Sequence, residues 1–204
     1  SLDGQEVLKI SKTFNADLHQ PEKTGELVEK DSYIDIHINE ILKLDLVDIE
    51  SIKNRGYKIV VDAVNSTGGI AVPKLLEKLG VNVIKLYCDP TGDFPHNPEP
   101  LKENLSDLSN LVSEQEADLG IVVDPDVDRL AFVSENGDIF GEEYTLVACA
   151  DYVLGIVPGP TVSNLSSTRA LKDVSDTHNC EYNSSAVGEV NVVEMMKNTK
   201  AVIG

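Results

Sequence analysis

The chain has 204 residues, 41% of them hydrophobic and 25% charged, which is the balance of an ordinary globular protein and excludes a disordered or fibrous one. Its formal net charge is −18, with only 17 lysines and arginines. A nucleic acid or an anionic membrane surface needs a basic face, so neither is expected as a partner. An anionic substrate then has to be attracted by a bound cation or by a few placed basic side chains.

Three cysteines, Cys88, Cys149 and Cys180, stand at wide spacings without a Cys-x-x-Cys pair. This pattern does not indicate a zinc site, and we expect a reducing, cytoplasmic location. The apolar runs are well short of the roughly 20 residues that span a bilayer. The sequence opens on Ser1 and reads as mid-domain sequence, so the lack of a signal peptide says nothing about a parent protein.

The first 48 residues predict helices, although the periodicity is weak. Ile34, Ile38 and Ile41 fit one face of a helix, whereas Ile34, Ile36 and Ile38 also fit the alternation of a strand. Because glutamates and lysines dominate the flanks, the helix is preferred.

From residue 57 to residue 140 the predicted strands and helices alternate. Strands are expected at 57–61, 81–87 and 119–123, and helices at 70–79 and 101–111. Residues 135–138, Glu-Asn-Gly-Asp, predict a hairpin turn between two further strands, 129–134 and 139–140. Alternation with short loops indicates right-handed crossovers and a mainly parallel sheet.

A second cycle begins near Gly141. Its expected elements are a helix at 142–154, a strand at 161–165, a short helix, a strand near 180–183, a helix from 189 and a strand at 201–203. The fold class is therefore predicted to be α/β, with two mainly parallel-sheet domains. We expect the second to be incomplete, because its last strand has no loop after it.

The most informative segment is the acidic loop Asp124-Pro-Asp126-Val-Asp128-Arg129, which follows the apolar strand 119–123. Its three carboxylates converge at the carboxyl end of that strand, where ligands of open α/β sheets bind. Crowded carboxylates repel one another unless a cation neutralises them, and oxygen ligands favour Mg²⁺ or Ca²⁺. Arg129 adds a guanidinium suited to a phosphate.

Three other interpretations of this loop fit less well. A solvated acidic turn does not explain the apolar runs on both sides. A calcium loop of the EF-hand type needs glycine at its sixth position, where Arg129 stands, and a helix rather than a strand before it. A phosphatase of the haloacid-dehalogenase type shares Asp124-Pro-Asp126, but Asp128 replaces its usual Thr or Val.

The acidic loop closely resembles the metal loop of the α-D-phosphohexomutases, the family of phosphoglucomutase and phosphomannomutase. Three further segments are similar to that family, residues 62–68, residues 92–105 and Ser185-Ala-Val-Gly188. The resemblance extends from about Arg55 to the end of the chain. It implies that residues 1–48 are the helical tail of domain 1, that residues 49–140 are domain 2, and that residues 141–204 are an incomplete domain 3.

The resemblance also implies a chemistry. Members of the family move a phosphoryl group between C1 and C6 of a hexose through a phosphoserine and a bisphosphorylated sugar. Asp124, Asp126 and Asp128 are then the Mg²⁺ ligands, Arg129 contacts a phosphate, and Gly188 allows a close approach of the backbone to the substrate. The expected partners are a phosphosugar and the missing domains of the parent chain.

Two segments are better explained by structure than by chemistry. Residues 65–69, Asn-Ser-Thr-Gly-Gly, predict a tight turn between a strand and a helix rather than a phosphate cradle, because no Gly-Lys-Ser/Thr follows. His96 lies among prolines and is expected to be a fixed loop residue. No Ser-His-Asn-Pro-like phosphoserine motif is present, so we expect the chain to be inactive alone. The kind of sugar stays open.

Overall fold

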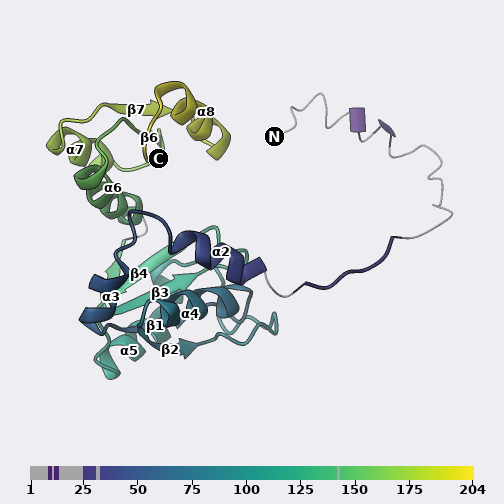
Figure 1. Ribbon diagram of the computed structural model, residues 1–204. Helices are drawn as coiled ribbons and strands as arrows, with labels where there is room; N and C mark the ends of the chain where they lie inside the picture. Colours follow the sequence, from purple (N-terminus) through teal and green to yellow (C-terminus); the bar gives the residue numbers. More distant parts are fainter. Residues whose placement is uncertain (1–8, 11, 14–24, 31–32, 142) are drawn as a thin grey trace. The chain divides into compact units, whose positions relative to one another are not determined.

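The computed structural model describes residues 9–10, 12–13, 25–30, 33–141 and 143–204. Part of the segment predicted to be the helical tail of a preceding domain, residues 1–8, 11, 14–24 and 31–32, lies outside the described residues. The chain divides into two units, residues 1–33 and residues 34–204. The second unit carries the two sheets found among the described residues (Figure 1).

The helices of the described chain follow the predicted order. They are α2 (Tyr33–Ile41), α3 (Ile49–Arg55), α4 (Gly68–Lys78), the 3-10 turn η1 (Lys102–Asn104), α5 (Ser106–Glu114), α6 (Tyr144–Ile156), α7 (Ala170–Thr177) and α8 (Glu189–Thr199). The strands are β1 (Lys58–Asp62), β2 (Asn82–Leu86), β3 (Leu119–Val123), β4 (Leu130–Ser134), β5 (Ile139–Phe140), β6 (Thr161–Asn164) and β7 (Tyr182–Ser185).

The first sheet has five strands in the order β2-β1-β3-β4-β5. Strands β2, β1 and β3 are parallel, whereas β3–β4 and β4–β5 are antiparallel. The α/β class is thus confirmed, and the sheet is mixed rather than mainly parallel. The reason is two tight connections, the acidic loop at residues 124–129 between β3 and β4 and the predicted hairpin turn at residues 135–138 between β4 and β5, each of which returns the chain beside the strand it has just left.

Two apolar layers cover the faces of this sheet. On one face, Val60 of β1 and Val122 of β3 pack with Leu108 and Val112 of α5. On the other face, Ile59 and Val61 of β1 pack with residues of α3 and α4. Strand β1 is therefore buried on both faces, which is why it reads in the sequence as an unbroken apolar run.

The helix predicted over residues 101–111 is interrupted. Leu101 has extended backbone angles before η1, and α5 begins only at Ser106. Leu105 and Leu108 are fully buried under the sheet. The apolar spacing identified the right face of the segment but not its start, because the leucines continue through the short 3-10 turn.

Helix α4 begins against the end of the sheet at two glycines. A Cβ on Gly69 would lie 2.2 Å from the carbonyl oxygen of Cys88, and one on Gly68 would lie 2.5 Å from Cγ2 of Val123. No side chain fits at such distances. The glycine pair therefore allows the helix to start close to the carboxyl ends of β2 and β3.

Helix α2 is anchored to α4 by charge and by burial. Nζ of Lys74 lies 2.7 Å and Nζ of Lys78 3.2 Å from the carboxylate of Asp35, and Ile38 is 2% exposed. The preference for a helix over a strand at residues 34–42 is confirmed.

The second sheet contains β6 and β7, which are parallel. Thr161 at the start of β6 also makes an isolated bridge to Ile203, where the sequence predicts a full strand. Strand β7 begins two residues later than predicted, at Tyr182. Helices α6, α7 and α8 accompany this sheet in the order expected from the sequence. Among the described residues, no helix has the length and apolarity to cross a bilayer.

Candidate metal and phosphate site

The acidic loop connects β3 to the antiparallel strand β4. Asp124 is the first residue after β3 and is only 6% exposed, whereas Asp126 and Asp128 are exposed. The amide of Val127 donates to the carbonyl of Asp124 at 3.2 Å, which closes a tight turn. The loop thus projects one buried and two exposed carboxylates from the end of the sheet.

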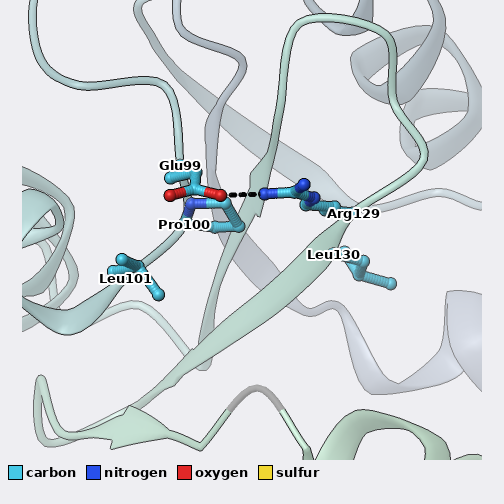
Figure 2. A pocket seen from close by; sticks show the side chains of 5 residues that line it. All are labelled: Glu99, Pro100, Leu101, Arg129 and Leu130. Atoms are coloured by element: carbon cyan, nitrogen blue, oxygen red, sulfur yellow. Dashed lines mark hydrogen bonds and ion pairs between the residues drawn. The ribbon is translucent and has the colours of Figure 1, made fainter. Parts of the chain in front are cut away.

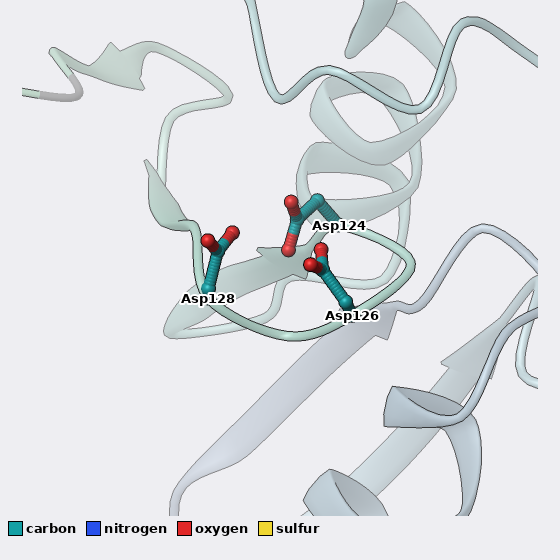
Figure 3. Close-up of side chains that lie close together, drawn as sticks. All are labelled: Asp124, Asp126 and Asp128. Atoms are coloured by element: carbon teal, nitrogen blue, oxygen red, sulfur yellow. The ribbon is translucent and has the colours of Figure 1, made fainter. Parts of the chain in front are cut away.

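The three carboxylates converge (Figure 3). One oxygen from each of Asp124, Asp126 and Asp128 lies within 4.8 Å of the others. Ligand oxygens on opposite sides of Mg²⁺ are about 4.2 Å apart, twice a coordination distance of about 2.1 Å. No two ligand oxygens of one Mg²⁺ lie farther apart than this, so the three carboxylates have to close in slightly, and the exposure of Asp126 and Asp128 leaves room for that rotation. The residues therefore fit a hard divalent cation held by oxygen.

The backbone of the loop is strained between the last two carboxylates. Val127 has a φ of 63°, in the left-handed region that a β-branched side chain rarely adopts. Such a residue costs on the order of 1–3 kcal/mol and persists where the surroundings impose it, often at functional sites. The strained residue thus lies between Asp126 and Asp128, whose carboxylates converge.

Arg129 is tied to the acidic loop through its backbone and to a second loop through its side chain. Its amide donates to Oδ1 of Asp124 at 3.1 Å, and its Nε lies 4.0 Å from Oδ2 of Asp124. Its Nη1 forms an ion pair with Oε1 of Glu99 (Figure 2). The hydrogen bond to Glu99 raises the pKa of the guanidinium, so Arg129 is a fixed positive charge beside the carboxylates.

A cavity of about 390 Å³ opens next to this ion pair. It is lined by Glu99, Pro100, Leu101, Arg129 and Leu130. The guanidinium reaches into it from the start of β4, as Figure 2 shows. A phosphate that enters the cavity meets a planar, permanently charged donor, the group best suited to bidentate phosphate binding.

Residues 65–69 form hydrogen bonds to the backbone of the acidic loop. The hydroxyls of Ser66 and Thr67 donate to the carbonyl of Pro125 at 2.7 and 3.1 Å. Helix α4 begins directly after them at Gly68. The segment is thus the strand-to-helix turn that the sequence predicts, and its hydroxyl groups fix the position of the acidic loop.

A buried pair joins the end of β1 to the proline-rich loop. Nε2 of His96 lies 3.0 Å from Oδ2 of Asp62, and the Asp62 side chain is 1% exposed. Burial raises the pKa of Asp62, although the hydrogen bond from the Val64 amide and the nearby His96 oppose the effect. His96 is therefore fixed in its loop, as expected for a loop among prolines.

Gly188 lies in the turn between β7 of the second sheet and α8, whereas the other candidate residues lie at the end of the five-stranded sheet. It precedes α8 with a φ of 118°, a conformation that only glycine adopts easily. A Cβ there would lie 3.4 Å from Nδ2 of Asn191. The glycine is thus required by the backbone of the turn.

Sequence reasoning did not identify Asp62 and Glu99 as parts of the site. Asp62 could have been found, because it is the last residue of a buried strand that ends at the same edge of the sheet as the strand before Asp124. Glu99 could not, since a glutamate in an exposed loop 30 residues before Arg129 gives no local signal of its partner.

Comparison with known proteins places the chain in one family. Residues 31–137 match the family domain described as phosphoglucomutase/phosphomannomutase, alpha/beta/alpha domain II. Residues 141–204 match alpha/beta/alpha domain III of the same description. The boundaries predicted at residues 48 and 140 stay predictions.

Individual relatives agree with the family match. A probable phosphoglucosamine mutase of Methanopyrus kandleri is 32% identical over 200 residues, covering 96% of this chain and 43% of that protein. A phosphoglucomutase/phosphomannomutase of Thermococcus kodakarensis is 33% identical over 195 residues, covering 94% of this chain and 42% of that protein. The chain thus spans about two fifths of the length of these relatives.

A solved structure shows the same arrangement. The crystal structure of a phosphoglucomutase/phosphomannomutase family protein of Burkholderia thailandensis superposes with a TM-score of 0.81 at 28% identity. The match covers 98% of this chain and 43% of that one. The chain therefore belongs to the phosphoglucomutase/phosphomannomutase family and carries sequence of its domains II and III.

Proposed function

We propose that this chain is the metal-binding part of a phosphohexomutase, an intramolecular phosphotransferase that interconverts hexose 1-phosphates and hexose 6-phosphates. The observation that carries the proposal is the convergence of Asp124, Asp126 and Asp128 beside Arg129 at the end of β3. Membership of the family supports it, since its named relatives are mutases of phosphosugars.

The proposed ligands of Mg²⁺ are the three carboxylates. When bound, the cation supplies charge neutralisation for phosphoryl oxygens. Asp124 is held by the amide of Arg129, whereas Asp126 and Asp128 are free to rotate at the exposed edge. The loop therefore combines one fixed ligand with two adaptable ones.

The proposed role of Arg129 is to hold a phosphate next to that cation. Its present partner Glu99 is exposed to about the same degree, 51% against 55% for the arginine. An exposed ion pair contributes about 0–1 kcal/mol, so a doubly charged phosphate competes with it readily. Arg129 then has an anionic partner in both states, Glu99 when the site is empty and the phosphate when substrate is bound.

Gly188 is proposed to bring its backbone close to the substrate from the second sheet. Its φ of 118° and the absence of a side chain at this position support that role. The phosphoserine that exchanges the phosphoryl group is proposed to lie outside this chain. The missing domains of the parent protein are then the partners of the site, and the cytoplasm its proposed location.

The family match leaves the sugar open. The relatives are named as mutases of glucosamine, glucose and mannose phosphates. We propose a phosphorylated hexose of this class as the substrate and a bisphosphorylated sugar as the intermediate of the whole enzyme. The 204-residue chain alone is expected to be inactive.

The reading frame that encodes this chain tests the proposal. A Ser-His-Asn-Pro-like motif upstream and conversion of glucose 1-phosphate or mannose 1-phosphate by the complete product are the expected results. The complete product with Asp126→Asn is expected to lose most of this turnover, whereas Asp89→Asn, at an exposed carboxylate on another loop, keeps it. A complete product that lacks mutase activity on every hexose phosphate contradicts the proposal.

Two rival functions give different results. A calcium-binding interaction module predicts a strong preference for Ca²⁺ over Mg²⁺ and a large rise in melting temperature with Ca²⁺. A phosphatase of the haloacid-dehalogenase type predicts hydrolysis of a phosphate ester by this chain alone, dependent on Asp124. Turnover of glucose 1-phosphate by the 204-residue chain contradicts the assignment of the phosphoserine to another part of the parent.

A further inference from the structure

The proline-rich loop, residues 93–101, approaches the site at two places. His96 contacts the end of β1 through Asp62, and three residues later Glu99 pairs with Arg129 at the start of β4. One short segment thus connects a buried carboxylate at the end of β1 with the guanidinium beside the acidic loop.

The hydrogen bonds of His96 define where its protons lie. Its Nδ1 is 2.8 Å from the carbonyl oxygen of Asn97, which can only accept, so Nδ1 carries a proton. The Nε2–Oδ2 contact to Asp62 then contains one more proton, carried by the imidazole or by the carboxyl group. Whichever group carries this proton, the contact between His96 and Asp62 is a hydrogen bond. Because Asp62 is buried, breaking the bond leaves its carboxyl oxygen Oδ2 without a partner.

The imidazole of His96 also packs against an aromatic ring. The ring of Tyr87 meets the ring of His96 edge to face, with 5.8 Å between centroids. The Tyr87 hydroxyl donates to Asp107 of α5 at 2.7 Å. His96 is therefore fixed by β1 and by the segment after β2, and its side chain is only 14% exposed.

The segment from His96 to Glu99 is stiff. The amide of Glu99 donates to Oδ1 of Asn97 at 3.2 Å, and Nδ2 of Asn104 donates to the carbonyl of Glu99 at 2.8 Å. A residue fixed at one end of such a segment also fixes the other end. The Glu99 carboxylate itself is half exposed, so its position depends on the backbone that carries it.

We propose that His96 is a positioning residue: its bond to Asp62 sets the place of Glu99, and through it the orientation of Arg129 beside Asp124. The inference rests on the proposed function in so far as Arg129 and the three carboxylates form a metal and phosphate site. The coupling itself is a property of the loops. The pair His178–Asp151, with Nε2 at 2.7 Å from the carboxylate, joins the residue after α7 to α6 and offers a matched control.

The side-chain Nε–Hε NMR signals of arginine report the coupling directly, because the chain has only three arginines, at positions 55, 129 and 169. The Arg129 signal, identified by its loss in Arg129→Lys, is expected to move toward that of a free arginine in His96→Ala. It is expected to stay in place in His96→Gln, whose amide can still donate to Asp62, and in His178→Ala. The shifts of the second sheet are expected to remain unchanged in all variants.

A second variant separates coupling from folding. Glu99→Gln is expected to shift the Arg129 signal while the ring-nitrogen shifts of His96 stay as in the wild type. If His96→Ala does not fold, the Arg129 signals of His96→Gln and Glu99→Gln test the proposal instead. An Arg129 signal that is unmoved by Glu99→Gln, or one released in a folded His96→Gln as fully as in His96→Ala, overturns the proposal.

A Mg²⁺ titration of the same samples distinguishes the inference from the proposed function. His96→Ala is expected to weaken Mg²⁺ binding by roughly tenfold, the size of effect seen when an outer hydrogen-bond partner of a metal site is lost, and His96→Gln to restore it. A wild-type chain that binds no Mg²⁺ contradicts the proposed function, while the Arg129 signal still tests the coupling. Equal Mg²⁺ affinity in the wild type and His96→Ala contradicts the inference.

Discussion

The backbone amide of Arg129 donates a 3.1 Å hydrogen bond to Oδ1 of Asp124, so the last residue of the acidic loop is tied to its first. Asp124 is the buried member of the carboxylate triad. The bond fixes both the Asp124 carboxylate and the backbone of Arg129 without using the arginine's side chain. The guanidinium of Arg129 therefore remains available to pair with Glu99 or with a phosphate.

The strain at Val127 gives a prediction about stability. Val127→Gly removes a left-handed β-branched residue, a gain of about 1–3 kcal/mol, but loses partial burial and adds the backbone entropy of glycine, each about 1 kcal/mol. We expect the free energy of unfolding to stay within about 1 kcal/mol of the wild type in urea titrations.

The control is the same substitution at a regular position. Val133 is fully buried in β4, and Val133→Gly is expected to cost at least about 3 kcal/mol. Equal losses in the two variants show that the loop backbone is not strained.

The close approach of α4 to Cys88 gives a second prediction. Gly69→Ala places a Cβ 2.2 Å from a carbonyl oxygen of the backbone, so the helix has to move. We expect a loss of about 2 kcal/mol or more in the free energy of unfolding. Gly25→Ala, where a Cβ meets nothing within 4 Å, is expected to change it by less than about 0.5 kcal/mol. A Gly69→Ala variant as stable as Gly25→Ala rules out the close packing of this helix end.

The ion pairs of Asp35 predict part of the acid sensitivity. Hydrogen bonds from Lys74 and then Lys78 lower the pKa of Asp35 below its ordinary value of 3.8. A carboxylate with a lowered folded pKa adds stability above its unfolded pKa and loses it as the pH falls through the folded value. Asp35→Asn is therefore expected to flatten the fall in melting temperature below about pH 4. If the melting temperature of Asp35→Asn falls below about pH 4 as steeply as that of the wild type, the ion pairing of α2 with α4 is contradicted.

Thiol chemistry tests the packing at the end of β2. Burial raises the pKa of Cys88 to about 11, so at pH 8 roughly one molecule in a thousand carries the thiolate. Cys149 is exposed. We expect iodoacetamide to modify Cys88 at least about tenfold more slowly than Cys149, measured by peptide mass spectrometry. Equal rates imply that the end of β2 opens to solvent.

Much of the fold was predictable because its signals are local. The unbroken apolar runs at β1 and β3 identify strands buried on both faces, and the Asn-Gly pair at residues 136–137 identifies the hairpin. The three carboxylates of the loop were predictable as neighbours for the same reason, since alternate residues after one strand share one turn.

What escaped prediction depends on contacts between distant segments. The pairing of Glu99 with Arg129 and of His96 with Asp62 is produced by the path of the proline-rich loop, which no periodicity encodes. The isolated bridge at Ile203, in place of a strand, likewise depends on the strand beside it. Local propensity specifies elements, whereas tertiary contacts decide their ends and their partners.

The most direct test of the account is a calorimetric Mg²⁺ titration of the 204-residue chain. We expect weak binding that is lost in Asp126→Asn and kept in Asp89→Asn, because removal of one of three carboxylates takes away both a ligand and a charge. Binding in the micromolar range that survives Asp126→Asn contradicts the assignment of the site to Asp124, Asp126 and Asp128.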